Sequence, residues 1–139
     1  MPTVTYTYRF PYGYSSQGQP FPILPIQLLN PADTRRSVEV AAYLDSGTER
    51  SLFDGTLALA LGIDLLHGRR ITYFSAGGTG IDAFVLPVKI RHPELGQFDL
   101  EVGFSSITLA RNLLGRDFFN LVQIGFREHH LLFYITPEP

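Results

Sequence analysis

Short runs of alternating apolar and polar residues dominate this chain and restrict the folds that it can adopt. In SVEVAAYL (37–44) and QFDLEVGF (97–104), apolar residues recur at every second position, which is the period of a half-buried strand. Four further strand-like runs lie between turns rich in glycine, proline or charged residues: 71–74, 81–90, 121–126 and 130–135. A chain of many short strands closes into a sandwich or barrel, so we expect a mainly β domain.

The beginning of the chain departs from this pattern. Residues 1–20 are rich in tyrosine, serine, glycine and proline, and we interpret them as an N-terminal extension or arm, loosely attached to a domain of residues 21–139. The alternation within residues 3–8 is compatible with one strand in this arm. The apolar run after it contains Pro22 and Pro25, which lack the N–H that a central strand needs, so we predict an edge or bent strand.

Two segments carry helix signals. Asp54 is a suitable N-cap, and the apolar residues after it are followed by Gly62, a common helix end. A shorter helix is predicted around residues 115–121. We therefore expect one or two short helices beside the strands.

Composition and charge exclude several classes of function. With 45% hydrophobic and 17% charged residues, the 139 residues match one ordinary globular domain. The net charge of −2 provides no basic field, so neither nucleic acid nor a membrane surface is an expected partner. The absence of cysteine excludes disulfides and a thiolate nucleophile. We see no secretory signal and no membrane-spanning segment, so we expect a soluble, cytoplasmic protein.

The adjacent histidines His129 and His130 raise the question of a metal site. Neighbouring residues in a strand point to opposite faces, so the two rings would not share one ion. We expect a turn between two strands here, and neither a metal nor another cofactor.

Three other motifs are candidates for chemistry. Residues 45–48 read Asp-Ser-Gly-Thr at the end of a predicted strand, residues 75–80 form the glycine-rich tip of a predicted hairpin, and residues 112–119 read NLLGRDFF. Taken alone, the triplet most often forms an Asx-turn and the glycines most often form only a hairpin tip. A phosphate loop would need a lysine and a helix after the glycines, whereas a strand follows Gly80, so phosphate binding is excluded.

In their order, these motifs resemble those of the retropepsin-like aspartic proteases, single-domain relatives of pepsin. The resemblance rests on YLDSGTERSLF, FSAGGTGIDAFVLPVKI and NLLGRDFFNLVQIGF, and it extends over residues 21–135. It implies the closed, barrel-like acid-protease (retropepsin) fold and an aspartic endopeptidase, a hydrolase that cuts extended peptide or protein substrates.

The mechanism implied by this resemblance needs two carboxylates. One is the base that activates a water molecule and the other is the acid that polarises the peptide carbonyl, because the pair shares one proton. The chain contains a single Asp-Ser-Gly triplet. The second carboxylate must therefore come from Asp45 of another copy, and we expect a twofold homodimer.

The resemblance also implies roles for the neighbours of the aspartate. Ser46 would bond across the twofold axis to the partner loop, and Gly47 would donate its N–H to the carboxylates. The hydroxyl of Thr48 would donate to the carboxylate and favour its charged form, which predicts an acidic optimum. Glu49 and Arg116 would pair and support the loop of residues 45–51, which we call the active loop.

The glycine-rich hairpin would be a flap that closes over the peptide, which lies extended as an added strand. Its residues would be Ala76, Gly77, Gly78, Thr79 and Gly80. One alternative is a retropepsin-like peptide-binding or dimerisation module without cleavage activity. Another is an unrelated β-barrel binding protein in which Asp45 only caps a turn. We favour the enzyme, because a binding module has no need of an aspartate at a buried, repulsive axis.

Overall fold

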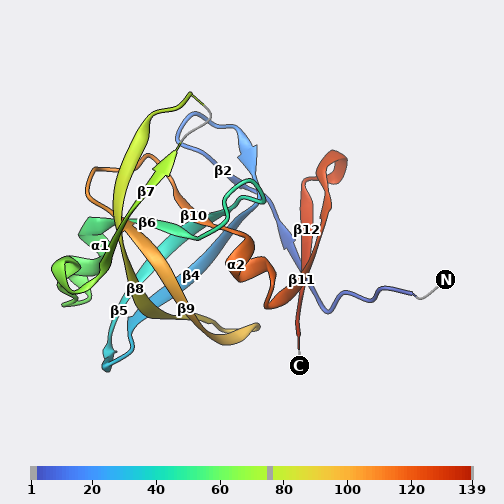
Figure 1. Ribbon diagram of the computed structural model, residues 1–139. Helices are drawn as coiled ribbons and strands as arrows, with labels where there is room; N and C mark the ends of the chain where they lie inside the picture. Colours follow the sequence, from blue (N-terminus) through green and yellow to red (C-terminus); the bar gives the residue numbers. More distant parts are fainter. Residues whose placement is uncertain (1–2, 75–76, 139) are drawn as a thin grey trace.

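Alternating strands form most of the computed structural model, which describes residues 3–74 and 77–138 (Figure 1). The strands are β1 (Tyr8–Pro11), β2 (Gly13–Tyr14), β3 (Pro20–Phe21), β4 (Ile23–Asn30), β5 (Asp33–Leu44), β6 (Leu52–Asp54), β7 (Arg69–Phe74), β8 (Gly80–His92), β9 (Gly96–Ser105), β10 (Asn112–Leu114), β11 (Val122–Arg127) and β12 (Leu132–Pro137). The helices are α1 (Gly55–Ala60) and α2 (Arg116–Phe119), with 3₁₀ turns η1 (Leu65–His67) and η2 (Glu128–His130).

The largest sheet closes on itself. Its strand order is β4-β5-β10-β6-β9-β8-β7, and an additional pairing of β4 with β8 joins the two sides. The prediction of a mainly β, closed barrel with short helices is therefore confirmed. Phe53, Phe104 and Phe118 are fully buried in its core, and the burial of each ring stabilises the fold by about 1.5–3 kcal/mol.

Both predicted helices are present. Asp54 caps α1 by accepting the N–H of Thr56, and the chain leaves the helix through Gly62, whose φ of +73° favours glycine. The second helix, α2, begins after Gly115 and is a single turn. It buries Phe118 against the barrel.

The proline-containing strand β4 is only partly the edge that its sequence predicts. It pairs with β5 along its length, and its residues 27–29 also pair with β8. Pro25 lies before this second pairing, where no strand of the described residues pairs with the other side of β4. The missing N–H of the proline is tolerated for that reason.

The N-terminal strand lies further along than its alternation suggests. The strand is Tyr8–Pro11 rather than residues 3–8, and it pairs antiparallel with β12, which in turn pairs with β11. Tyr12 is buried and its hydroxyl donates to Glu128 Oε1 at 2.8 Å. The expectation of a loosely attached segment is therefore wrong for residues 8–12.

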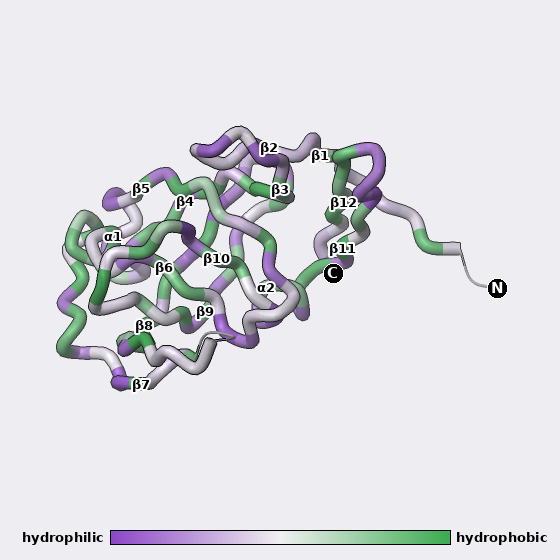
Figure 2. The backbone as a smooth tube through the Cα atoms, turned by 90° about the horizontal axis from the view of Figure 1, so that it is seen from above, coloured by the Kyte–Doolittle hydropathy of each residue, from purple (hydrophilic) through white to green (hydrophobic). Residues whose placement is uncertain are grey.

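The three-stranded sheet β1-β12-β11, which we call the side sheet, lies to one side of the barrel (Figures 1 and 2). The helix α2 lies between the side sheet and the barrel. The predicted turn between the last two strands is confirmed as η2. In this turn the rings of His129 and His130 contact each other, with centroids 5.4 Å apart, so the opposite-face argument for a strand does not apply. In the described part of the chain, no helix is long and apolar enough to cross a membrane.

Candidate active site

Asp45 directly follows Leu44, the last residue of β5. It lies beside β10, the strand formed by the first three residues of the NLLGRDFF motif. Strands β5 and β10 run parallel, with Leu44 opposite Leu114. The N–H of Asp45 donates to the carbonyl of Leu114 at 2.9 Å. This pairing brings the first and third sequence motifs together, although they are far apart along the chain.

The carboxylate of Asp45 is held by its own loop. Oδ1 accepts the N–H of Gly47 at 2.8 Å, and Oδ2 accepts the hydroxyl of Thr48 at 3.1 Å. The first of these hydrogen bonds closes an Asx-turn. The same geometry therefore both forms a local turn and fixes the orientation of the Asp45 carboxylate. A β-carbon on Gly47 would lie 3.1 Å from Oδ1. Asp45 is half-buried and Ser46 is exposed.

Gly115 allows the active loop to approach α2 closely. A β-carbon at this position would overlap the carbonyl group of Thr48. That carbonyl accepts the N–H of Arg116 at 2.7 Å. The glycine of the Gly-Arg-Asp motif is therefore required by the packing of one backbone on another.

Asp117, in α2, holds the active loop through hydrogen bonds, a role that the sequence analysis did not predict. Its carboxylate accepts the N–H of Ser51 at 2.9 Å and the Ser51 hydroxyl at 2.7 Å. The hydroxyl of Ser51, which is fully buried, also accepts the N–H of Gly115 at 2.9 Å. The available signal was an acidic residue in the first turn of a helix that directly follows the glycine.

The expected pair of Glu49 and Arg116 is not formed within the described residues. Both side chains are exposed, and no ion pair of residues 3–74 and 77–138 joins them. The backbone carbonyl of Glu49 instead accepts the N–H of Asp117 at 3.1 Å. In this structure the loop is held by Asp117 and by backbone hydrogen bonds.

The predicted hairpin is present as β7 and β8, with Phe74 opposite Gly80. Its tip residues Gly77, Gly78, Thr79 and Gly80 are exposed, whereas Ala76 lies outside the described residues. Gly78 has a φ of +81°, which favours glycine.

Asp82 secures the lower part of this hairpin. Its carboxylate accepts Arg70 Nη2 at 2.7 Å and the hydroxyl of Thr72 at 3.2 Å. The hydrogen bond and the charge of Arg70 hold the pKa of Asp82 below its usual range. The strands are thus joined by side chains as well as by their backbone ladder.

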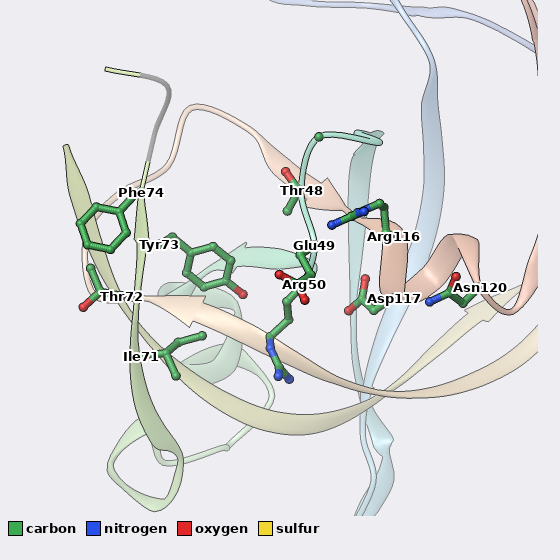
Figure 3. Close-up of a pocket in the computed structure, with 11 residues that line it drawn as sticks. Thr48, Glu49, Arg50, Ile71, Thr72, Tyr73, Phe74, Arg116, Asp117 and Asn120 are labelled. Carbon is green, nitrogen blue, oxygen red and sulfur yellow. The ribbon is translucent and has the colours of Figure 1, made fainter. Parts of the chain in front are cut away.

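A cavity of about 800 Å³ lies between the hairpin, the active loop and α2 (Figure 3). It is lined by residues 47–50 and 71–74 and by Arg116, Asp117 and Asn120. Figure 3 shows Tyr73 on the hairpin side, with its hydroxyl directed toward the loop.

The hydroxyl of Tyr73 donates to the carbonyl of Ser51 at 3.2 Å. Burial raises the pKa of Tyr73, so this hydroxyl stays protonated over the range in which carboxylates titrate. A β-carbon on Gly103 would overlap the Tyr73 ring, which rests directly on that backbone. Tyr73 therefore connects the hairpin to the loop that follows Asp45.

Comparison with solved structures identifies the architecture. A retropepsin-like aspartic protease from Rickettsia conorii superposes with a TM-score of 0.64 and 16% sequence identity, over 96% of each chain. EIAV protease in complex with the inhibitor HBY-793 superposes with a TM-score of 0.52 and 20% identity, over 72% of this chain and 86% of that one. This chain has a retropepsin-like fold.

The retropepsin-like fold rules out the unrelated β-barrel fold that was one of the alternatives from the sequence.

No protein-family model and no curated protein match the sequence. The described residues contain no group of three or more His, Cys, Asp or Glu side chains arranged to hold a metal ion.

Proposed function

We propose that this chain is an aspartic endopeptidase that acts as a homodimer. The observation that carries the proposal is the geometry of Asp45 within a retropepsin-like fold. Each oxygen of its carboxylate accepts a hydrogen bond from the same loop, and that loop borders a cavity beneath a glycine-rich hairpin. Gly47 and Thr48, which hold the carboxylate, line this cavity. A carboxylate held in one orientation in a loop that borders a space for a peptide is suited to general acid–base chemistry.

In the proposed mechanism, two Asp45 carboxylates, one from each subunit, share one proton and bind a water molecule between them. The ionised carboxylate takes a proton from the water as its oxygen attacks the peptide carbonyl carbon. The protonated carboxyl donates its proton to the carbonyl oxygen, which gives a tetrahedral diol. The carboxyl that took its proton from water then gives it to the amide nitrogen, while the other carboxylate takes a proton from one hydroxyl of the diol. The C–N bond breaks, an acid and an amine are released, and the pair again shares one proton.

A second copy is required because the chain contains one Asp-Ser-Gly triplet. The side sheet offers a surface for it, since β1 and β11 are its outer strands and, among the described residues, each has one edge without a strand partner. Tyr6 and Phe126 lie on this sheet with 37% and 45% of their surface exposed. We propose that this surface contributes to an isologous contact that brings the two Asp45 loops together, with Ser46 of each loop bonding to the other.

In the same proposal the β7–β8 hairpin is the flap. The peptide lies extended between the hairpin and the active loop, and hydrogen-bonds through its backbone as an added strand. The Thr48 hydroxyl donates to Oδ2 of Asp45. We propose an acidic optimum, because the mechanism needs two carboxylates that share one proton.

The decisive experiment is peptide cleavage between about pH 3 and pH 7, a range that covers carboxylate titration, by the native protein, Asp45→Asn and Asp99→Asn. Asp99 is an exposed carboxylate paired with Lys89 on the outer face of β9, so it controls for the loss of one negative charge. We expect Asp45→Asn to lower kcat/KM by at least about a hundredfold and Asp99→Asn to leave it unchanged. Equal cleavage by Asp45→Asn would exclude Asp45 from catalysis. Absence of cleavage by a dimeric native protein that still binds peptides would favour the non-catalytic module.

A further inference from the structure

Arg111 holds a positive charge against two aromatic rings close to the active loop. It lies directly before β10, and its guanidinium carbon is 4.2 Å from the ring centroid of Phe21 and 4.9 Å from that of Tyr43. The two rings also contact each other, with centroids 5.4 Å apart. Two aromatic faces attract the cation and restrict where the planar guanidinium can lie.

This aromatic pair lies on the same side of β5 as Asp45. Along β5, Val40, Ala42 and Leu44 are buried in the core, so the residues between them face the other way. Tyr43 therefore projects from the face on which Asp45 follows two residues later. Two residues of extended chain span roughly 7 Å, which sets the distance between the aromatic pair and the catalytic loop along the strand.

Strand β10 confirms the same side for Arg111. Leu113 is the registered partner of Tyr43 in the parallel pair, and partners in a sheet project to the same face. Arg111 stands two residues before Leu113, and its guanidinium covers the Tyr43 ring directly. The cation, both rings and the loop of Asp45 thus lie along one face of the β5–β10 pair.

The charge of Arg111 has no acidic partner within the described residues. Arg35 and Arg36 pair with Asp33, and Arg70 pairs with Asp82. No such ion pair or side-chain hydrogen bond is formed by Arg111 in the described part of the chain, and its side chain is exposed. Its planar fork of N–H donors is therefore available to a carboxylate that arrives from outside.

We propose that Arg111 selects substrates with an acidic side chain close to the scissile bond. This inference rests on the proposed endopeptidase function, in which the peptide passes Asp45 in extended form. A distance of roughly 7 Å corresponds to about two residues of such a peptide. The guanidinium donates parallel hydrogen bonds to the substrate carboxylate, while Phe21 and Tyr43 pack on the methylene groups of that side chain.

The test uses a library of synthetic peptides whose central residues vary. For each central position, one version of the library carries Glu there and a matched version carries Gln, while the other central residues stay varied. Cleavage products of the native protein, Arg111→Gln and Arg111→Lys are followed by mass spectrometry near pH 6, where a substrate glutamate is ionised. We expect the native protein to cleave the best Glu peptide about tenfold faster than its Gln match. Arg111→Gln reduces this ratio to about one, and Arg111→Lys retains an intermediate ratio because it keeps the charge but loses the fork.

Peptide binding to Asp45→Asn, with and without Arg111→Gln, separates this inference from the proposed function. Fluorescence anisotropy of labelled Glu and Gln peptides measures the charge preference without any cleavage. A Glu preference that depends on Arg111 supports the inference, even if the native protein fails to cleave and the endopeptidase proposal is thereby refuted. An equal response to Glu and Gln, or a Glu preference that survives Arg111→Gln, overturns the inference and leaves the endopeptidase proposal untouched.

Discussion

At the scale of single residues, the hydrogen bonds around Asp45 orient the proposed catalytic carboxylate. The Gly47 N–H fixes one oxygen and the Thr48 hydroxyl fixes the other. Both donors lie two or three residues after the aspartate, so four consecutive residues, 45–48, determine the orientation of the carboxylate.

The first prediction concerns the hydrogen bond that the Thr48 hydroxyl donates to Asp45. Replacing Thr48 by Val keeps the shape of the side chain and removes the donor to Asp45 Oδ2. Because the hydroxyl fixes one oxygen of the proposed catalytic carboxylate, Thr48→Val should lower kcat/KM for peptide cleavage by roughly tenfold. Thr48→Ser, which keeps the hydroxyl, should retain the native kcat/KM. Equal kcat/KM values for the native protein and Thr48→Val would contradict the role given to this hydroxyl.

The buried support from Asp117 leads to a prediction about stability. Asp117→Asn replaces an oxygen that accepts from Ser51 with an NH₂ group that cannot accept. We expect a loss of about 2 kcal/mol in the free energy of unfolding, because a buried donor is left unsatisfied. Urea denaturation measures it. Asp99→Asn, at an exposed site, serves as the matched control, and an equal stability of the two variants would argue against the network.

At the scale of elements, Asp54 links the start of α1 to the segment before β10. Besides the N–H and hydroxyl of Thr56, its carboxylate accepts the N–H of Leu109 at 3.0 Å. Leu109 lies two residues before Arg111, so the cap also positions the segment that carries the proposed specificity residue. One aspartate thereby connects a helix start to the site.

These hydrogen bonds, chiefly the one from Leu109 and then those from Thr56, hold the pKa of Asp54 below its usual range. A carboxyl whose folded pKa is depressed stabilises the protein above the unfolded value, about 3.9. That stability is lost as the pH falls through the folded pKa. The difference in unfolding free energy between native protein and Asp54→Asn should therefore be largest above about pH 4 and shrink at lower pH. Urea denaturation at several pH values checks this, and a constant difference would contradict it.

At the scale of the whole molecule, the barrel and the side sheet have separate tasks. The barrel buries the core and holds the loop, the hairpin and α2 around one cavity. The side sheet lies beside the barrel (Figure 2) and buries Phe133 and Ile135 in the same core. Tyr6 and Phe126, which lie on this sheet, are partly exposed. The proposed dimer, in which each chain supplies one Asp45, needs a surface of this kind for the second copy.

The strand-like runs predicted β5, β7, β8, β9, β11 and β12, and the order of the three motifs predicted the fold. The hydrogen bonds from Gly47 and Thr48 to Asp45 were expected. By contrast, the expected pair of Glu49 and Arg116 is not formed within the described residues.

The remaining features depend on contacts between residues far apart in the chain. Tyr8 pairs with Ile135, and Ser51 bonds to Asp117. Local patterns carry no information about such partners, because the register of distant strands decides them. The stack of Arg111 on two rings was missed for the same reason.

Mixing native protein with Asp45→Asn tests the central claim, that the active site needs one Asp45 from each of two chains. The two proteins are unfolded together in equal amounts, refolded, and assayed for peptide cleavage at constant total concentration. If each site contains two copies of Asp45, random assortment leaves roughly a quarter of the activity of the native protein alone. Roughly half of the activity would remain if each chain worked by itself, and that result would contradict the account.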